Sequence, residues 1–412
     1  MSTITEVRTT REEFNFQPEG LVAIDEKYLD TRSDIEITAI LKCHQPVTTQ
    51  RNVWAIWGDG LEKMPEWCLR NVISWVRRLG PSWTVRVVDL VSGSPNQIYH
   101  FVDADEFPSN FNDVLPEAKH GGVYMDVSTL IFRSLDDICW SALEDPKSPY
   151  KVALFEYQCR KHFGQVMNNF IACTKGDPFI KNCKSTSFLI LGDNCLCLLN
   201  TGHAIFCSVW QDSPSLEGAH AHPLLRHLGL LEPDDPGFGE NPDFTKFTDY
   251  AAHMLSYERL RLLEEPGQDG FSGTKYFKDH IFLLSAWKEE FYGQDEIDGE
   301  ELYQLLSLDF RPKDSADKLQ QRAKEFVIGL LSKSAIAKFG ESYWHPGMPL
   351  PLPTLWKKNP GSDCKPGTWA AYLRWASVHM DQTRRLGRCL EPIPIPDEKD
   401  TVVQVKVLEP VA

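Results

Sequence analysis

The feature that most constrains the fold is a strand–helix–strand pattern between residues 52 and 90. Residues 53–57 form a short run that is apolar on both faces, which is typical of a buried parallel strand. Apolar residues then recur at helical spacing over 68–79, and residues 84–90 predict a second strand. Two parallel strands joined by a helix form a right-handed βαβ unit, so the sequence predicts an α/β fold.

Charge and composition exclude several classes of protein. The chain has 412 residues, with 43 Lys and Arg against 58 Asp and Glu, and its net charge is -15. A protein that holds nucleic acid by neutralising phosphates usually has the opposite charge, so a nucleic-acid partner would need a local basic patch. The 11 Cys show no paired CxxC spacing, which argues against a zinc ribbon. The N-terminus lacks the apolar stretch of a signal peptide, and we expect a reduced, cytoplasmic protein with no membrane partner.

The pattern along the chain divides it into three parts. We expect a polar N-terminal leader over residues 1–50 that packs late or not at all, a catalytic domain over 51–310, and a helical, Pro-rich extension over 311–412. Further strands are predicted at 35–41, 123–125, 129–132, 152–155 and 170–174, and helices at 224–231, 250–263, 280–291 and 368–383.

The sequence GGVYMD at residues 121–126 is the sharpest local signal for a functional site. Gly121 and Gly122 allow backbone to come close to a ligand. Asp126 follows a very short strand, and the carboxyl end of an inner parallel strand is where open α/β sheets bind ligands. The alternative is that Asp126 only caps a turn.

Two segments together carry a resemblance to a known family. WAIWGDGLEKMPEWCLRNVISW at residues 54–75, followed by GGVYMDVSTLIFRSLDD at 121–137, resembles the capsular-polysaccharide-synthesis family of glycosyltransferase-like proteins. That family is related to the glycosyltransferases that carry a GGxYxDxD motif, and the resemblance covers about residues 50–310. It implies a GT-A-like nucleotide-diphospho-sugar transferase core with a Rossmann-like, mostly parallel sheet.

This chain departs from the DxD motif at its second acid. In the resembling enzymes two carboxylates bind a divalent metal, which neutralises the departing nucleotide diphosphate. The corresponding residues here are Asp126, Val127 and Ser128, and a serine hydroxyl brings no charge. Asp126 and Ser128 are therefore the candidate metal ligands, in a site that should hold a divalent ion weakly.

The missing acid favours the hypothesis that the fold has left sugar chemistry. The resemblance extends to a fungal branch that includes arginine-containing cyclodipeptide synthases, which condense arginyl-tRNA with a second aminoacyl-tRNA to a diketopiperazine. Such a reaction needs no metal, because the aminoacyl ester is already activated. The main alternative is a nucleotide-sugar glycosyltransferase that uses Mg or Mn, and a third is a binding protein without catalysis.

The candidate site residues follow from these hypotheses. Asp126 is a candidate guanidinium partner or base, and Asp103, Asp105 and Glu106 form an acidic group in a loop after a strand. His280 beside Asp279 is a candidate general base. The alternatives are a solvated acidic loop and a packed histidine. The candidate substrate-binding residues are Gly121, Gly122, Tyr124, Ser128, Asn168 and Trp57.

A local basic surface for tRNA is expected from two segments. Basic residues occur on the predicted helix at 68–79, and the tail interleaves them with tryptophans, a composition that suits stacking on single-stranded acceptor ends. The alternative is an ordinary helix with a solvated face. These residues are Arg70, Arg77, Arg78, Lys357, Lys358, Lys365, Arg374, Arg384, Arg385, Arg388, Trp356, Trp369 and Trp375. The sequence leaves the second amino acid and the oligomeric state open.

Overall fold

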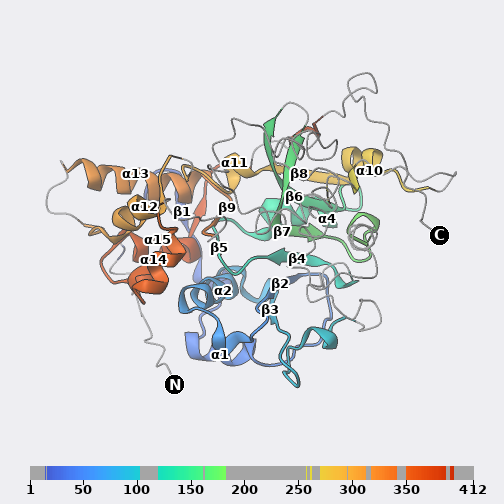
Figure 1. Ribbon diagram of the computed structural model, residues 1–412, viewed down its shortest axis with the longest axis horizontal. Helices are drawn as coiled ribbons and strands as arrows, with labels where there is room; N and C mark the ends of the chain where they lie inside the picture. The colour runs from blue at the N-terminus through green and yellow to red at the C-terminus, as the bar shows by residue number, and fades with distance from the viewer. Residues whose placement is uncertain are drawn as a thin grey trace, which may run out of the picture.

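The computed structural model describes residue 14 and residues 16–102, 119–160, 163–181, 257, 260–261, 270–294, 296–311, 317–340, 349–386 and 390–393 (Figure 1). The strands are β1 (Leu21–Ala23), β2 (Asn52–Ile56), β3 (Thr84–Val88), β4 (Gly122–Met125), β5 (Thr129–Ile131), β6 (Val152–Arg160), β7 (Phe163–Cys173), β8 (Ile281–Ser285), β9 (Ile336–Lys338) and β10 (Met380–Gln382). The helices are α1 (Asp34–Leu41), α2 (Glu66–Leu79), α4 (Ser141–Glu144), α10 (Gly273–His280), α11 (Ala286–Glu289), α12 (Gly299–Ser307), α13 (Lys318–Lys333), α14 (Leu352–Lys358) and α15 (Trp369–His379).

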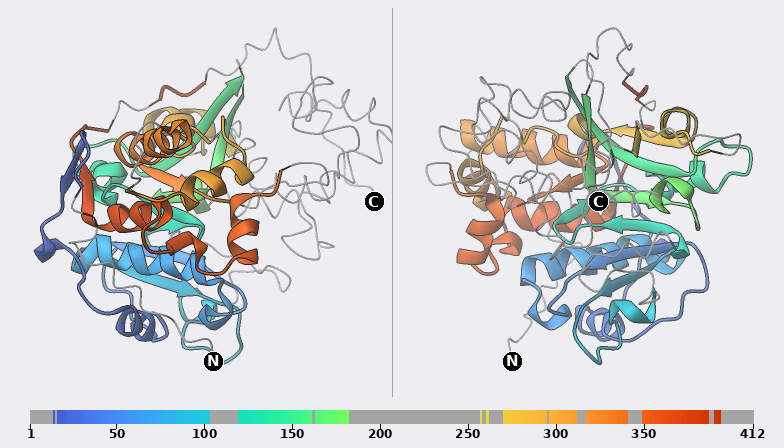
Figure 2. Two further views of the ribbon diagram at one scale, coloured as in Figure 1. Left: turned by 90° about the vertical axis from the view of Figure 1, so that its left-hand side faces the viewer. Right: turned by 45° about the vertical axis from the view of Figure 1, so that its right-hand side comes forward.

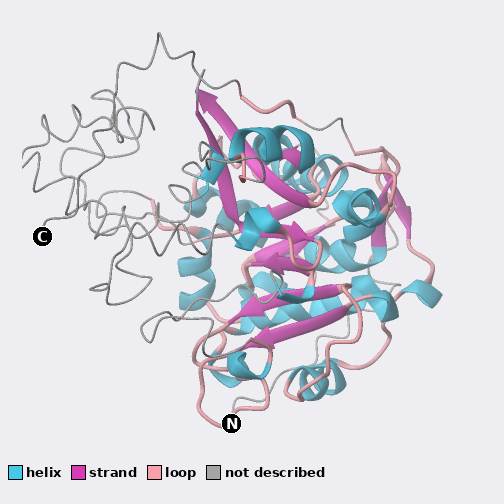
Figure 3. Ribbon diagram, turned by 90° about the vertical axis from the view of Figure 1, so that its right-hand side faces the viewer, coloured by secondary structure: helices cyan, strands magenta, loops and turns pink. Residues whose placement is uncertain are grey.

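A 6-stranded sheet with the order β3-β2-β4-β7-β6-β8 forms the centre of the fold. β2 is parallel to β3 and to β4, β6 is parallel to β8, and β7 is antiparallel to both of its neighbours. All strands except β7 therefore run in the same direction. The sheet crosses the described part of the molecule with helices packed against it (Figure 3). The expected GT-A-like α/β core with a mostly parallel sheet is confirmed.

The predicted βαβ unit is present and forms for the reasons that its sequence gives. The side chains of β2 are buried on both faces, as expected for an inner parallel strand. α2 begins after Pro65 and buries one face, including Val72 and Trp75. It ends at Gly80, which has a positive φ of 55° and lies so close to the backbone oxygen of Tyr28 that a side chain would not fit.

Helices from the C-terminal third cover one side of this core. Figures 1 and 2 show α12–α15 gathered together, with α15 beside α2. β9 pairs with β5, and β10 pairs with β1. The interpretation of residues 1–50 as a leader that packs late or not at all is wrong for the described part, because Phe14, Leu21, Ile37 and Leu41 belong to the core. The domain boundaries at 50 and 310 stay predictions.

Two predicted elements differ in type from those observed. Residues 35–41, predicted as a strand, lie in helix α1, which begins at a capping box formed by Ser33 and Glu36. Residues 280–291, predicted as one helix, contain the strand β8 and the short helix α11, because β8 pairs along β6. The helix predicted at 224–231 and most of that at 250–263 lie outside the described residues.

Candidate functional site

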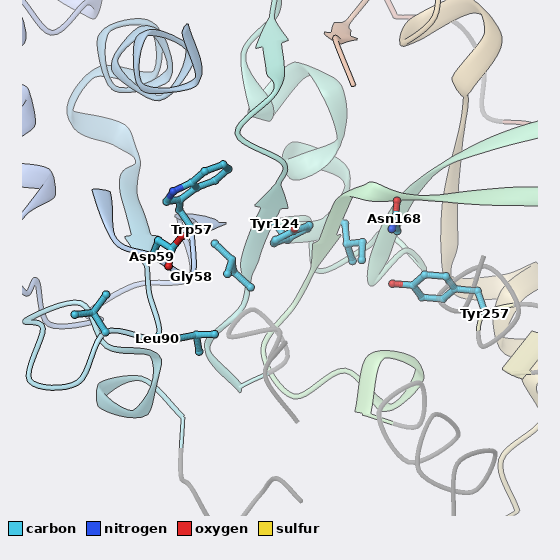
Figure 4. A pocket seen from close by; sticks show the side chains of 10 residues that line it. Trp57, Gly58, Asp59, Leu90, Tyr124, Asn168 and Tyr257 are labelled. Atoms are coloured by element: carbon cyan, nitrogen blue, oxygen red, sulfur yellow. The ribbon is translucent and has the colours of Figure 1, made fainter. Parts of the chain in front are cut away.

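A cavity of about 690 Å³ lies at the carboxyl ends of β2 and β3 (Figure 4). From β2 the chain passes to β3 on one side, whereas β4 lies on the other side of β2. The cavity is therefore at the point where the strand order reverses, and open α/β sheets bind their ligands at such points. Trp57, Gly58 and Asp59 reach it from the turn after β2, and Leu90 and Val91 from the end of β3.

Aromatic rings and a few polar groups line this cavity. Tyr124 comes from β4, Asn168 from β7, and Tyr257 from a separate segment. In Figure 4 the hydroxyl of Tyr257 points toward the side on which Tyr124 lies. Rings such as Trp57 suit stacking on a planar base, while Asp59 and Asn168 offer oxygen and amide groups that suit sugar hydroxyls. The lining therefore fits a nucleoside better than a purely apolar ligand.

Asp126 follows β4 and connects to the cavity through Tyr124. The Tyr124 hydroxyl donates a hydrogen bond of 2.7 Å to Asp126 Oδ1, and Lys338 Nζ lies 2.5 Å from Asp126 Oδ2. The backbone N–H of Asp126 donates to the backbone oxygen of Asn169 at 3.0 Å. One carboxylate oxygen is therefore held by a residue that lines the cavity, and the other by an ammonium.

One face of α2 fixes the segment that follows Asp126. Asn71 Nδ2 donates to the backbone oxygen of Val127 at 2.9 Å, and Trp75 Nε1 donates to that of Thr129 at 2.9 Å. Arg78 Nη2 donates to the backbone oxygen of Phe132 at 2.7 Å. Residues three and four positions apart share a helix face, so this spacing lets one helix hold a whole extended segment. The turn at Asp126 is thus supported by buried hydrogen bonds.

Glu290 is a buried acid behind this turn. Asn169 Nδ2 donates to Glu290 Oε1 at 2.6 Å. Burial raises the pKa of the Glu290 carboxyl to about 8, the Lys338 charge and the Asn169 hydrogen bond lower this pKa, and the Asp126 charge raises it. At neutral pH Glu290 is therefore mostly protonated and adds little negative charge beside Asp126.

The described residues do not fit a divalent metal ion. Both carboxylate oxygens of Asp126 already accept hydrogen bonds, and Ser128 stands where a second acid would be needed. Within the part of the chain that the structure describes, no group of three or more His, Cys, Asp or Glu side chains is placed to hold a metal. An ion at Asp126 would also meet the charge of Lys338. The Mg or Mn ion expected for a glycosyltransferase remains a prediction that this arrangement does not favour.

The structure brings four predicted site residues together and adds others. Trp57, Tyr124 and Asn168 line one cavity, and Tyr124 connects it to Asp126. Ser128 lies in the turn after Asp126, where its backbone oxygen accepts the Phe339 N–H at 3.0 Å. The residues that the sequence did not indicate are Asp59, Tyr257, Glu290 and Lys338. For Asp59 a signal existed, because it follows a predicted strand.

Other predicted residues lie elsewhere. His280 precedes β8, and its Nδ1 lies 2.7 Å from the Pro149 oxygen. Because β8 and β4 run in the same direction, His280 is at the opposite edge of the sheet from Asp126, so its predicted role as a base at the site is wrong. Gly121 precedes β4 and Gly122 is its first residue, so both lie at the opposite edge of the sheet from Asp126, and a Cβ on Gly122 would lie 2.4 Å from the Asn52 backbone oxygen. These glycines serve strand packing rather than ligand approach.

Asp103 and Asp105 lie outside the described residues. Several residues of the basic surface predicted for tRNA are instead buried or paired with an acid. Arg70 and Arg374 both pair with Asp363 at 2.6 Å, and Arg78 is buried against backbone oxygens. The three tail tryptophans are buried, so they do not form an exposed stacking surface; these are Trp356, Trp369 and Trp375.

Comparison with known proteins identifies the family. The O-glycosyltransferase braB of Annulohypoxylon truncatum is 38% identical to this chain, covering 95% of this chain and 94% of its own length. The glycosyltransferase afumC of Aspergillus fumigatus is 37% identical, covering 86% and 91%, and the O-glycosyltransferase PaGT of Phomopsis amygdali is 32% identical, covering 95% and 97%. No family model matches the chain. The solved PaToxG glycosyltransferase is 15% identical with a TM-score of 0.25, and the match covers 54% of this chain and 94% of its own length.

An α/β core with a cavity at the reversal of its strand order is the arrangement in which open α/β sheets bind their ligands. The chain belongs to the family of glycosyltransferases that contains braB, afumC and PaGT. The expected resemblance to glycosyltransferases is confirmed, and the hypothesis of an arginine-containing cyclodipeptide synthase is wrong. Arginyl-tRNA as a substrate is wrong for the same reason. Among the described residues, no helix combines the length and the apolar character that crossing a membrane requires.

Proposed function

We propose that this protein transfers a sugar from a nucleoside-diphosphate sugar to a hydroxyl group of an acceptor. The observation that carries the proposal is the aromatic cavity at the strand-order reversal, in a chain that is 38% identical to an O-glycosyltransferase over nearly its whole length. The cavity volume of about 690 Å³ is within the range of small-molecule sites. A cytoplasmic location for the reaction stays a prediction.

The lining residues suggest how the donor lies. The base would stack on Trp57, where apolar side chains from the end of β3 close one wall of the cavity. The sugar–diphosphate would then extend past Tyr124 toward Asp126, because Tyr124 contacts both the cavity and the acid. This orientation places the reacting carbon at the edge of the sheet, where the turn after β4 is rigidly held by α2.

The reaction needs little covalent chemistry from the protein. The acceptor oxygen attacks the anomeric carbon and loses its proton, and the bond from that carbon to the β-phosphate oxygen breaks. The electron pair stays on the nucleoside diphosphate, which gains negative charge as it leaves. Stabilising that charge is the main electrostatic task of the site.

A direct test is hydrolysis and transfer with a panel of nucleoside-diphosphate sugars. Wild-type protein should release the nucleoside diphosphate from at least one donor, measured by chromatography, and release should rise when an alcohol acceptor is added. The variant Trp57→Ala should lose about tenfold or more in donor affinity, since a base–aromatic stack contributes about 1–3 kcal/mol. Trp287→Ala removes an exposed ring that does not line the cavity, and it should behave like wild type. If no donor is bound or cleaved by the wild-type protein, the proposed function is wrong.

A further inference from the structure

Lys338 lies against the acid that follows β4. β9 pairs antiparallel with β5, in a register that places Lys338 opposite Thr129. The next residue, Phe339, donates its N–H to the Ser128 oxygen at 3.0 Å. Strand pairing therefore holds Lys338 over the turn from Asp126 to Thr129, and its Nζ lies 2.5 Å from Asp126 Oδ2.

The pair is partly shielded from water without being closed off. The side chain of Lys338 is 12% exposed and that of Asp126 is 28% exposed. A charge at this depth is screened less than a surface charge, yet a ligand can still approach it. Because Tyr124 lines the cavity and also donates to Asp126, a ligand that extends from the cavity along Tyr124 reaches this pair.

The charges at this position balance in the same way as in a metal-binding DxD site. Two carboxylates and a divalent cation sum to zero, and so do Asp126 and Lys338, since Ser128 is neutral. Adding a divalent cation here would leave an excess of positive charge beside a lysine that strand pairing keeps in place. With a neutral Ser128, Lys338 therefore balances the charge of Asp126 without a metal ion.

We propose that Lys338, held by Asp126, binds the β-phosphate of the donor and neutralises the departing nucleoside diphosphate, in the place of a divalent ion. This inference rests on the proposed function. As the bond between the anomeric carbon and the β-phosphate oxygen breaks, the electron pair moves to that oxygen, and the Lys338 ammonium stabilises the added charge without giving up a proton. The proton of the acceptor hydroxyl passes to water.

The competing explanation is a purely structural ion pair that holds β9 to the turn. A structural pair predicts a loss of stability when Lys338 is changed, with no selective effect on phosphate binding. A phosphate-binding lysine predicts that the second phosphate of a nucleotide contributes affinity without metal, and that this contribution depends on the lysine.

The experiment compares the affinities of nucleoside mono- and diphosphates by titration calorimetry, with uridine, guanosine, adenosine and thymidine nucleotides as probes. Each titration is done in a chelator and again with Mn²⁺. In chelator, the wild-type protein should bind the preferred diphosphate about tenfold or more tightly than its monophosphate. Mn²⁺ should change this ratio by less than about twofold. A wild-type protein that prefers the diphosphate only with Mn²⁺ overturns the inference, and this arm needs no variant.

Variants then test the lysine itself. Lys338→Met keeps the length of the side chain and should lose about tenfold in diphosphate affinity while monophosphate affinity stays unchanged; Lys338→Arg should restore part of the loss. Lys358→Met, on the exposed end of α14, is the matched control and should match wild type. If Lys338→Met retains the diphosphate preference, the inference is wrong and the proposed function stands. If the wild-type protein binds no nucleotide under either condition, the proposed function fails.

Discussion

Asn169 and Glu290 face each other in the interior, with Asn169 Nδ2 2.6 Å from Glu290 Oε1 and both side chains enclosed. Neighbouring residues of β7 have opposite tasks: Asn168 lines the cavity, whereas Asn169 points to the other face and binds the buried acid. The same strand therefore connects the ligand side of the site with its buried support.

This relationship predicts how the stability of the protein depends on pH. The pKa of Glu290 is about 8 in the folded state, above its ordinary value of 4.5, so the folded state holds the proton more tightly. Stability should be greatest below the unfolded pKa and should decline by up to a few kcal/mol as the pH rises through about 8. Glu290→Gln imitates the protonated acid, and its decline should be much smaller. Urea unfolding from about pH 5 to about pH 9 measures both curves; parallel curves would contradict the assignment.

The hydrogen bonds from α2 to the segment after Asp126 predict a cost for losing one of them. Trp75→Phe keeps most of the buried ring but leaves the Thr129 oxygen without its donor at 2.9 Å. We expect a loss of about 1–3 kcal/mol in the free energy of unfolding. Trp287→Phe, at an exposed ring, is the control and should change stability by less than about 0.5 kcal/mol. Denaturant unfolding compares them, and equal losses would argue against the role of the Trp75 hydrogen bond.

The role of Gly122 in strand packing is also testable. Gly122 has a φ of 120°, and a Cβ there would lie 2.4 Å from the Asn52 oxygen. Gly122→Ala should therefore destabilise the fold by about 2 kcal/mol or more. Gly93 also has a positive φ, of 76°, but a Cβ there would have no atom within 4 Å. Gly93→Ala therefore measures the cost of the backbone conformation alone. Melting temperatures should fall much further for Gly122→Ala, and similar values for both would show that packing at β2 is unimportant.

The Tyr124 hydroxyl should act through Asp126. Tyr124→Phe keeps the ring in the cavity and removes the 2.7 Å hydrogen bond to Asp126 Oδ1. We expect kcat to fall by about tenfold, since Asp126 and the Lys338 that it holds lose their orientation, while the affinity for the nucleoside monophosphate stays within about twofold. Steady-state kinetics and nucleotide titration separate the two effects. A variant that loses affinity but not kcat would place the hydroxyl on the nucleoside instead.

A reciprocal prediction concerns metal binding. Ser128→Asp combined with Lys338→Met would restore a pair of acids and remove the competing charge, so the double variant should bind Mn²⁺ about tenfold more tightly than either single variant. Calorimetric titration of Mn²⁺ without nucleotide provides the measurement. Tight binding by Ser128→Asp alone would mean that Lys338 does not oppose a cation at this position.

Local patterns were sufficient where the structure depends on local contacts. The apolar run of β2 and the helical spacing of α2 predict the βαβ unit, and two residues that the sequence indicates, Trp57 and Tyr124, line the cavity. In contrast, the apolar run of β8 alone favours a helix, because the pairing with β6 that makes it a strand involves residues far away in sequence. The strand prediction for residues 35–41 disregards the local capping pair of α1, in which Ser33 N donates to Glu36 Oε2 at 2.8 Å.

The wrong prediction of a cyclodipeptide synthase has a physical origin. The neutral Ser128 predicts the loss of sugar chemistry only if the neutralising charge must come from the motif itself. Lys338 is 212 residues from Asp126 in the sequence, and only the pairing of β9 with β5 brings it there. No spacing rule links the two residues, so the sequence alone shows only that the second carboxylate is absent at Ser128.

The placement of β9 also matters while the protein is being made. When translation has passed the codon for Asp126, the ribosome must add another 212 residues before the partner of this acid exists. A nonsense mutation upstream of β9 would remove the lysine together with the strand that supports it. Even late truncations of the gene should therefore abolish the enzyme.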